Sequence, residues 1–289
     1  MQVQELIDRN LREASNQLTR APCPQRLRQA IDYALFPGGA RVRPKLVMAV
    51  AQACADASAP LACAAASAIE CLHCASLVQD DLSCFDNAAI RRGKPTVHHA
   101  FDERLAILAS DALIVGAFEI VSSCQCDDQL AQLALMRLLS ERVGAVNGIT
   151  AGQAWECEEQ INTDAYHQAK TGSLFAAATQ AGAVSVSADG KQWARTGACI
   201  GTAYQIADDI NDVVGCQNQL GKPVHVDAAN GRPNAVLELG VERAVAKLKA
   251  VIEQIIDTVP DCRNADFFIE TVRYEAKRFL PKEIALSAA

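Results

Sequence analysis

The chain has 289 residues and a net charge of −7, half of its residues are apolar, and only 5% are aromatic. A chain with this charge and no extended basic tract is not expected to bind nucleic acid. Alanine-rich runs with few aromatic residues favour helices over strands. Because no segment has the composition of a linker, we predict an all-α protein with one domain over residues 1–289.

Residues 2–19 carry apolar positions at helical spacing and predict an opening helix. They mix acidic and basic side chains without an apolar core, so they do not resemble a signal peptide. Twelve cysteines in such a chain indicate reduced thiols in the cytoplasm. Cys71 and Cys74 form a CxxC without a second one, which favours buried thiols over a zinc site.

A second apolar pattern over residues 27–35 is expected to stop at the sequence Phe36-Pro-Gly-Gly. Arg41 and Arg43 follow the two glycines. One interpretation is a turn with solvated arginines. The other is a loop that brings backbone and guanidinium groups to a phosphate.

From residue 46 to residue 79 the chain is nearly continuously apolar, and residues 62–79 predict a buried central helix. This helix delivers Asp80 and Asp81 at its end. His73 lies two helical turns earlier on the same face. A lone histidine in an apolar helix is usually a core residue, so its role needs other support.

The stretch that follows contains Asp80, Asp81 and Asp86, and then Arg91 and Arg92. Carboxylates are ligands that Mg²⁺ prefers, and arginines bind phosphates. Such residues also mark ordinary helix ends and loops. On an unbroken helix, positions 80 and 86 differ by about 240°. The sequence therefore predicts a bulge or a helix end between them if they share a metal ion.

Further helices are predicted over residues 104–121, 129–142, 148–159 and 166–183. Residues 171–188 are long enough to span a membrane, but their glycines and glutamine suit a buried helix better. No stable membrane anchor is expected. Lys170 and Thr171 stand in an otherwise apolar segment. Because a buried lysine is costly unless paired, we favour a site role for Lys170.

A second acidic cluster consists of Asp208, Asp209 and Asp212, which share one face of a predicted helix. Lys222 follows in a loop, and the chain after residue 240 predicts helices lying on the surface. No run has the period of a strand. Two acidic clusters with basic neighbours and an apolar helix behind them indicate a ligand with phosphate at one end and hydrocarbon at the other, such as a prenyl diphosphate.

Six motifs support a family resemblance. They are GGARVRP at 38–44, ECLHCASLVQDDLSCFDNAAIRRGKPT at 70–96, GQ at 152–153, KTG at 170–172, YQIADDINDVVG at 204–215 and LGKPVHVD at 220–227. With these motifs the chain resembles trans-isoprenyl diphosphate synthases from end to end. Within that family it is most similar to bacterial geranylgeranyl diphosphate synthases of carotenoid and bacteriochlorophyll pathways.

The resemblance implies the isoprenoid synthase fold, with helices around a deep central cavity, and a homodimer. It also implies a head-to-tail condensation of isopentenyl diphosphate with an allylic diphosphate (dimethylallyl, geranyl or farnesyl), supported by two or three Mg²⁺ ions. The released diphosphate is the expected proton acceptor. The implied metal ligands are Asp80, Asp86, Asp208 and Asp212.

The same resemblance assigns catalytic roles to Asp81 and Asp209 beside these ligands. The residues that stabilise the departing diphosphate are Lys170, Lys222 and Arg91. Those that hold isopentenyl diphosphate are Arg43, His73 and Arg92. Arg41, Thr171 and Gln205 complete the implied substrate-binding set.

The chain departs from the family pattern at a few positions. Ala40 stands where the family usually has lysine, so either Arg41 compensates or affinity for isopentenyl diphosphate falls. Gln79 replaces a common histidine, and Val226 and Arg232 stand where lysines are frequent. No metal ligand is lost, so we expect an active enzyme. The alternatives are a farnesyl diphosphate synthase, a non-catalytic partner subunit of a heteromeric synthase and, less favoured, a terpene cyclase.

Product length is predicted from the helix before Asp80. Ala75 and Ser76 lie about one turn below the metal site, where a farnesyl chain would end. In farnesyl synthases of this type an aromatic residue tends to stand there, whereas Ala75 leaves the tunnel open. The next floor is expected from Cys71 or Leu72, or from Val115 and Phe118. This depth predicts a twenty-carbon product, unless Ala75 is only a helix-packing residue.

Overall fold

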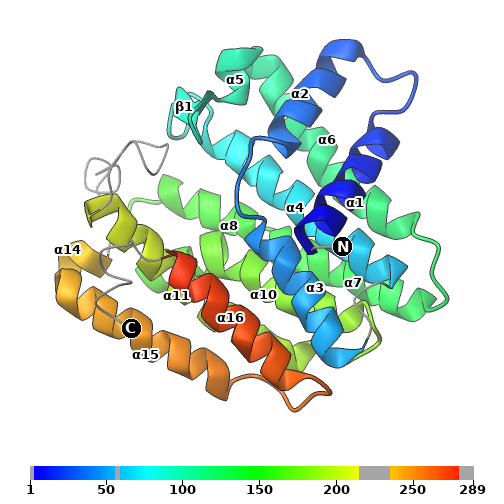
Figure 1. The fold of residues 1–289 in the computed structure, drawn as a ribbon. Helices are drawn as coiled ribbons and strands as arrows, with labels where there is room; N and C mark the ends of the chain where they lie inside the picture. Colours follow the sequence, from blue (N-terminus) through cyan, green and yellow to red (C-terminus); the bar gives the residue numbers. More distant parts are fainter. Residues whose placement is uncertain (1–2, 56–58, 215–234, 280–289) are drawn as a thin grey trace.

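A computed structural model describes residues 3–55, 59–214 and 235–279. Almost all of the regular structure in this part of the chain is helical (Figure 1). The α-helices of the first half are α1 (Val3–Leu18), α2 (Gln25–Leu35), α3 (Val42–Cys54), α4 (Pro60–Asp80), α5 (Val97–Ala100), α6 (Glu103–Ser122) and α7 (Gln129–Val143). Those of the second half are α8 (Ile149–Ala154), α9 (Thr163–His167), α10 (Ser173–Val184), α11 (Gly190–Val214), α14 (Ala235–Leu239), α15 (Val241–Asp257) and α16 (Ala265–Phe279).

Helix α4 forms the centre of the fold, as its apolar sequence predicts. It begins with Pro60 in the first turn, where the missing N–H costs no hydrogen bond. It packs against α3, α6 and α10 (Figure 1). Side chains on all of its faces are therefore buried. Its many alanines let these neighbours approach closely. Its C-terminal end at Asp80 is thereby held in place by the core.

The predicted helix over residues 166–183 is broken into three parts. A short α9 is followed by η2, a π-helical turn over Gln168–Gly172, and then by α10. A single π-helical turn inside a helical segment often occurs at functional sites. The predicted segment 148–159 also divides, into α8 and a 3₁₀ turn, η1 (Trp155–Cys157).

One small feature contradicts the expectation of no strands. Residues Ile90–Arg91 (β1) and Lys94–Pro95 (β2) pair antiparallel, with Arg91 opposite Lys94. Arg92 and Gly93 between them have positive φ angles of 53° and 75°. Two consecutive positive φ values fit a type I′ hairpin turn, which a two-residue loop favours. The hairpin is too short to produce an alternating pattern in the sequence.

The tail after residue 240 forms the surface helices that its periodicity predicts. Helix α15 buries Leu248, Val251 and Ile255 on one face and packs on α11. Helix α16 inserts Phe268 edge-on against Trp193, with ring centroids 4.9 Å apart. These contacts fix α11, the helix that carries the second acidic cluster.

Among the helices in the described part of the chain, α4 and α6 are long and apolar enough to cross a membrane by length and composition alone. Core helices of water-soluble folds meet the same criteria, and 78% of the relevant window of α4 is buried inside the bundle. The share for α6 is 44%, because one of its faces is exposed. Its length and composition are therefore weak grounds for a membrane span.

Candidate active site

The first acidic cluster forms where α4 ends. The helix stops at Asp80, and the chain turns so that the Asp86 backbone N–H donates to the Asp80 carbonyl at 3.0 Å. One carboxylate oxygen each from Asp80, Asp86 and Glu156 then lie within 4.8 Å of one another. The predicted helix end between positions 80 and 86 is confirmed. The three carboxylates fit a divalent cation by their chemistry and spacing.

Lys170 and Glu156 complete this end of the site. The Lys170 ammonium donates to Asp80 Oδ1 at 3.0 Å and to Glu156 Oε1 at 2.5 Å. Gln153 Nε2 donates to the same Asp80 oxygen at 3.0 Å. Burial favours a neutral Asp80, but the charge of Lys170 and the bond from Gln153 outweigh it, and the pKa of Asp80 lies below its ordinary value.

Glu156 is a site residue that was not predicted from the sequence. It lies three residues after Gln153 in the segment that begins with the GQ motif, so the spacing to Gln153 could have marked it. The segment reaches Lys170 because α8 packs tightly on η2. A Cβ atom on Gly152 would lie 2.3 Å from the Lys170 backbone nitrogen, so only glycine fits there.

The arginines of the hairpin face two directions. Arg91 Nε lies 2.8 and 2.9 Å from the two carboxylate oxygens of Asp81, and Arg91 Nη2 lies 3.5 Å from Asp80. Arg92 instead donates to the backbone carbonyl of Gly38. A side chain on Gly39 would collide with the Arg92 guanidinium at 2.6 Å, and Gly39 also has a positive φ of 124°. The glycine pair is therefore required where the hairpin meets the loop.

Arg43 lies beneath this loop beside His73. Its Nη1 is 3.3 Å from His73 Nε2, and its guanidinium stacks over Phe175 at 4.2 Å and near Tyr204 at 5.6 Å. Burial first, and then the charges of Arg43 and Arg92, hold the pKa of His73 well below its ordinary value. Neutral His73 can thus accept from Arg43. Within the described residues, Arg43 Nε is buried without a hydrogen-bond partner.

Arg41 has different partners from Arg43. Its guanidinium donates to Glu70 Oε1 at 2.5 Å and to the Leu35 carbonyl at 2.7 Å, and both charged side chains are almost fully buried. Arg41 has a left-handed backbone conformation (φ 51°), which turns its side chain inward as α3 begins. In this conformation Arg41 does not compensate for Ala40, and we assign it no substrate contact.

The second acidic cluster lies near the end of α11. Asp208 is partly exposed, whereas Asp209 and Asp212 are buried. Thr171 donates to Gln205 at 2.9 Å, and Gln205 donates to Asp209 at 2.8 Å. These bonds join α11 to η2, and thereby to Lys170 and Asp80 of the first cluster. Asp209 also accepts from the Ala235 backbone N–H at 2.8 Å, which anchors α14.

Some predicted positions lie outside the described residues. They are Lys222, Val226 and Arg232, together with the whole motif at 220–227. Among the described residues, no group that could hold a single ion joins the two acidic clusters. The clusters are linked by the hydrogen bonds of Lys170, Thr171 and Gln205 instead.

An apolar cavity of about 450 Å³ begins beside the first cluster, at Gln79 and Gln153, and we call it the inner cavity. Its lining residues are Leu72, Ala75, Ser76, Gln79, Leu82, Phe85, Ile107, Ile114, Val143, Ile149, Thr150, Gln153, Ala154 and Cys157. Ala75 and Ser76 therefore line it as expected. Val115 does not, since it is exposed on α6, and Phe118 packs against the core. Ile107 and Ile114 are the side chains that α6 contributes.

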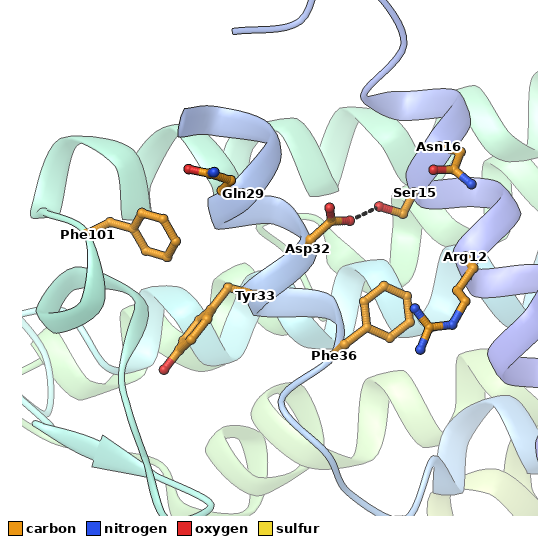
Figure 2. Close-up of a pocket in the computed structure, with 8 residues that line it drawn as sticks. All are labelled: Arg12, Ser15, Asn16, Gln29, Asp32, Tyr33, Phe36 and Phe101. Atoms are coloured by element: carbon orange, nitrogen blue, oxygen red, sulfur yellow. Dashed lines mark hydrogen bonds between the residues drawn. The ribbon is translucent and has the colours of Figure 1, made fainter. Parts of the chain in front are cut away.

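A second hollow, the outer cleft of Figure 2, measures about 620 Å³ and lies between α1, α2 and Phe101. Ser15 donates to Asp32 at 2.5 Å there, and the Arg12 guanidinium lies 4.7 Å from the ring centroid of Phe36. None of the predicted site residues lines it. Its Tyr33 hydroxyl donates to the Pro95 carbonyl at 2.7 Å, so this wall supports the hairpin.

The all-helical architecture and the acidic end of α4 define the isoprenoid synthase fold. A geranyltransferase from Helicobacter pylori, solved with magnesium and isoprenyl diphosphate, superposes with a TM-score of 0.80 at 27% identity, over 96% of this chain and 98% of that one. The sequence model of the polyprenyl synthetase family matches residues 24–267, and the chain belongs to that family.

Relatives with established names are also similar over most of their length. A geranylgeranyl diphosphate synthase from Cereibacter sphaeroides is 49% identical over 262 residues, 91% of each chain. One from Rhodobacter capsulatus is 44% identical over 257 residues, 89% of each chain. The predicted family resemblance is thus confirmed.

Proposed function

We propose that this protein is a Mg²⁺-dependent prenyltransferase that condenses isopentenyl diphosphate with allylic diphosphates to give geranylgeranyl diphosphate. The observation that carries the proposal is the inner cavity, an apolar space lined at one end by Gln79, which precedes Asp80, and by Gln153, whose side chain donates to Asp80. A diphosphate bound at the carboxylates can extend its hydrocarbon tail into this space. The names of the two bacterial relatives support the twenty-carbon product.

Asp80 and Asp86 of the first cluster, and Asp208 and Asp212 of the second, would hold two or three Mg²⁺ ions. When bound, these ions supply Lewis-acid polarisation of the departing diphosphate. Lys170 and Arg91, joined by Lys222 from outside the described residues, stabilise the negative charge of that group electrostatically. Asp81 orients Arg91 through the bidentate ion pair.

Arg43, His73 and Arg92 are the proposed contacts for isopentenyl diphosphate. The unpartnered Nε of Arg43 offers a buried donor to an anionic group. Phe175 and Tyr204 hold the guanidinium plane in a fixed orientation. Thr171 and Gln205 are proposed as further substrate contacts; Thr171 donates to Gln205, and Gln205 in turn orients Asp209.

The direct test is incubation of the purified protein with Mg²⁺, isopentenyl diphosphate and an allylic diphosphate, followed by chromatography of the products. A twenty-carbon product is expected. A fifteen-carbon product would indicate the alternative, a farnesyl diphosphate synthase. No condensation at all would support a non-catalytic partner subunit, and a cyclised hydrocarbon would support a terpene cyclase.

Product length gives a sharper prediction at Ala75, which is buried in the wall of the inner cavity. Ala75→Phe should shift the product from twenty to fifteen carbons, because the ring would block the cavity about one helical turn below Asp80. Chromatography of the products measures this. Ala75→Ser is the matched control and should leave product length unchanged. A folded, active Ala75→Phe enzyme that still makes twenty-carbon chains would show that position 75 does not limit product length.

The proposal includes a homodimer in the cytoplasm. Several large apolar side chains are exposed on the adjoining helices α6 and α7, among them Leu108, Val115, Leu130 and Leu133. Such a surface favours contact with a second copy of the chain. Sedimentation is expected to give the mass of two chains for the wild type and of one chain for Leu108→Glu, which places a charge in the contact. A monomeric wild-type protein would contradict this.

A further inference from the structure

Glu156 is a carboxylate of the site that the proposed chemistry does not use. Its side chain is only 14% exposed. Its Oε1 atom accepts from the Lys170 ammonium at 2.5 Å and from the Tyr166 hydroxyl at 2.6 Å. Tyr166 is itself buried, so its hydroxyl fixes the orientation of the carboxylate. The helices that carry these groups, η1, α9 and η2, lie within one short stretch of chain.

The Lys170 ammonium lies between two carboxylates that also belong to the candidate metal cluster. It is 3.0 Å from Asp80 Oδ1 and 2.5 Å from Glu156 Oε1. Asp80 cannot give its oxygens fully to a metal ion while Lys170 remains bonded to it. A long lysine side chain that lost Asp80 would be free to move, unless another group kept it in place. Glu156 is the group in position to do so.

We propose that Glu156 is a positioning residue that retains Lys170 in the site when Asp80 exchanges the ammonium for Mg²⁺. This inference rests on the proposed function. An ammonium has three N–H donors. One donor stays with Glu156, and the others turn from Asp80 toward the diphosphate. The carboxylate of Glu156 also offsets the charge of Lys170, so that the ammonium competes less with the metal ion for Asp80.

The test measures binding of Mn²⁺, used in place of Mg²⁺, by electron paramagnetic resonance in the presence of inorganic pyrophosphate. Glu156→Gln should weaken Mn²⁺ binding by about tenfold. Lys170 contacts two carboxylates, and after this substitution Asp80 is the only one of the two that remains. The ammonium therefore competes more strongly with the metal ion for Asp80. Glu158→Gln is the matched control, since it removes the same charge from an exposed position two residues away. It should leave Mn²⁺ binding within about twofold of the wild type.

The decisive comparison repeats Glu156→Gln in a Lys170→Met background. If Glu156 acts through Lys170, its replacement there should cost no more than about threefold, the direct electrostatic part. If Glu156→Gln lowered the affinity for Mn²⁺ equally in both backgrounds, Glu156 would be a metal ligand and the proposal would be overturned. The proposal would also be overturned if the affinity fell in neither background. Tyr166→Phe keeps the charge and removes one hydrogen bond, so an intermediate loss is expected in a variant with little risk to the fold.

Turnover separates this inference from the proposed function. Glu156→Gln should lower kcat more than it raises the KM for the allylic substrate, because Lys170 is needed mainly as diphosphate departs. A merely structural role would not lower kcat more than it raises KM and also make the loss of Mn²⁺ binding depend on Lys170. A wild-type protein that makes no prenyl product would defeat the proposed function. An active enzyme with equal Mn²⁺ losses in both backgrounds would defeat only the role of Glu156.

Discussion

Asp80→Ala is expected to lower turnover by at least about two orders of magnitude while the fold survives. The substitution removes a carboxylate from the only part of the described chain where three such groups could hold one ion. Lys170 keeps Glu156 as its partner, so no unpaired charge is buried by the change. Circular dichroism should therefore match the wild type, and steady-state assays over a range of Mg²⁺ concentrations measure the loss.

Asp208→Ala should produce a loss of similar size, because the second cluster is proposed to complete the metal site. Asp127→Ala is the control, since Asp127 is exposed in the loop before α7 and far along the chain from both clusters. Near-normal turnover in Asp208→Ala would show that the metal assignment on α11 is wrong. Loss of turnover in all three variants would point to a general effect of removing negative charge.

Arg41→Met should destabilise the protein by about 3–5 kcal/mol. The substitution leaves Glu70 buried without the guanidinium that now contacts it at 2.5 Å. Methionine has the same backbone preference against the left-handed conformation as arginine, so the charge effect is isolated. A loss of this size is a large part of the total stability of an ordinary domain. Urea unfolding followed by circular dichroism measures it.

Two further variants test the cause of this destabilisation. Arg9→Met breaks the exposed pair with Glu13 and should cost less than about 1 kcal/mol. Combining Arg41→Met with Glu70→Leu should recover much of the lost stability, because no charge then remains buried. If Arg41→Met cost no more than Arg9→Met, the buried ion pair would not contribute to stability as argued.

Local sequence determined most of the long helices and the central place of α4. A helix that is apolar on almost every side, with Glu70 as its one acidic residue before Asp80, favours burial on all sides. The helix end between positions 80 and 86 also follows from local geometry, and the chain does turn at that point. The family motifs likewise identify the family from the sequence alone, because both their residues and their spacing can be read along the chain.

The tertiary structure decided which similar residues face the site. Arg41 and Arg43 were both predicted to bind substrate, but Arg41 pairs with Glu70 inside the core and Arg43 lies beside His73. Their partners are on α4, some 30 residues away, so no local pattern could separate them. Exposed Val115 and the cavity residue Ile114 differ by one position, which is about 100° around α6.

Glu156 shows most clearly that local sequence does not predict contacts between distant segments. Its role depends on meeting Lys170 and Asp80, which come from segments 14 and 76 residues away along the chain and are brought together by the packing of α8 on η2. Helical periodicity reports which face of a helix is buried. It does not report which polar groups on other helices will contact that face. For this reason, only the folded chain reveals that Glu156 is the carboxylate that holds Lys170.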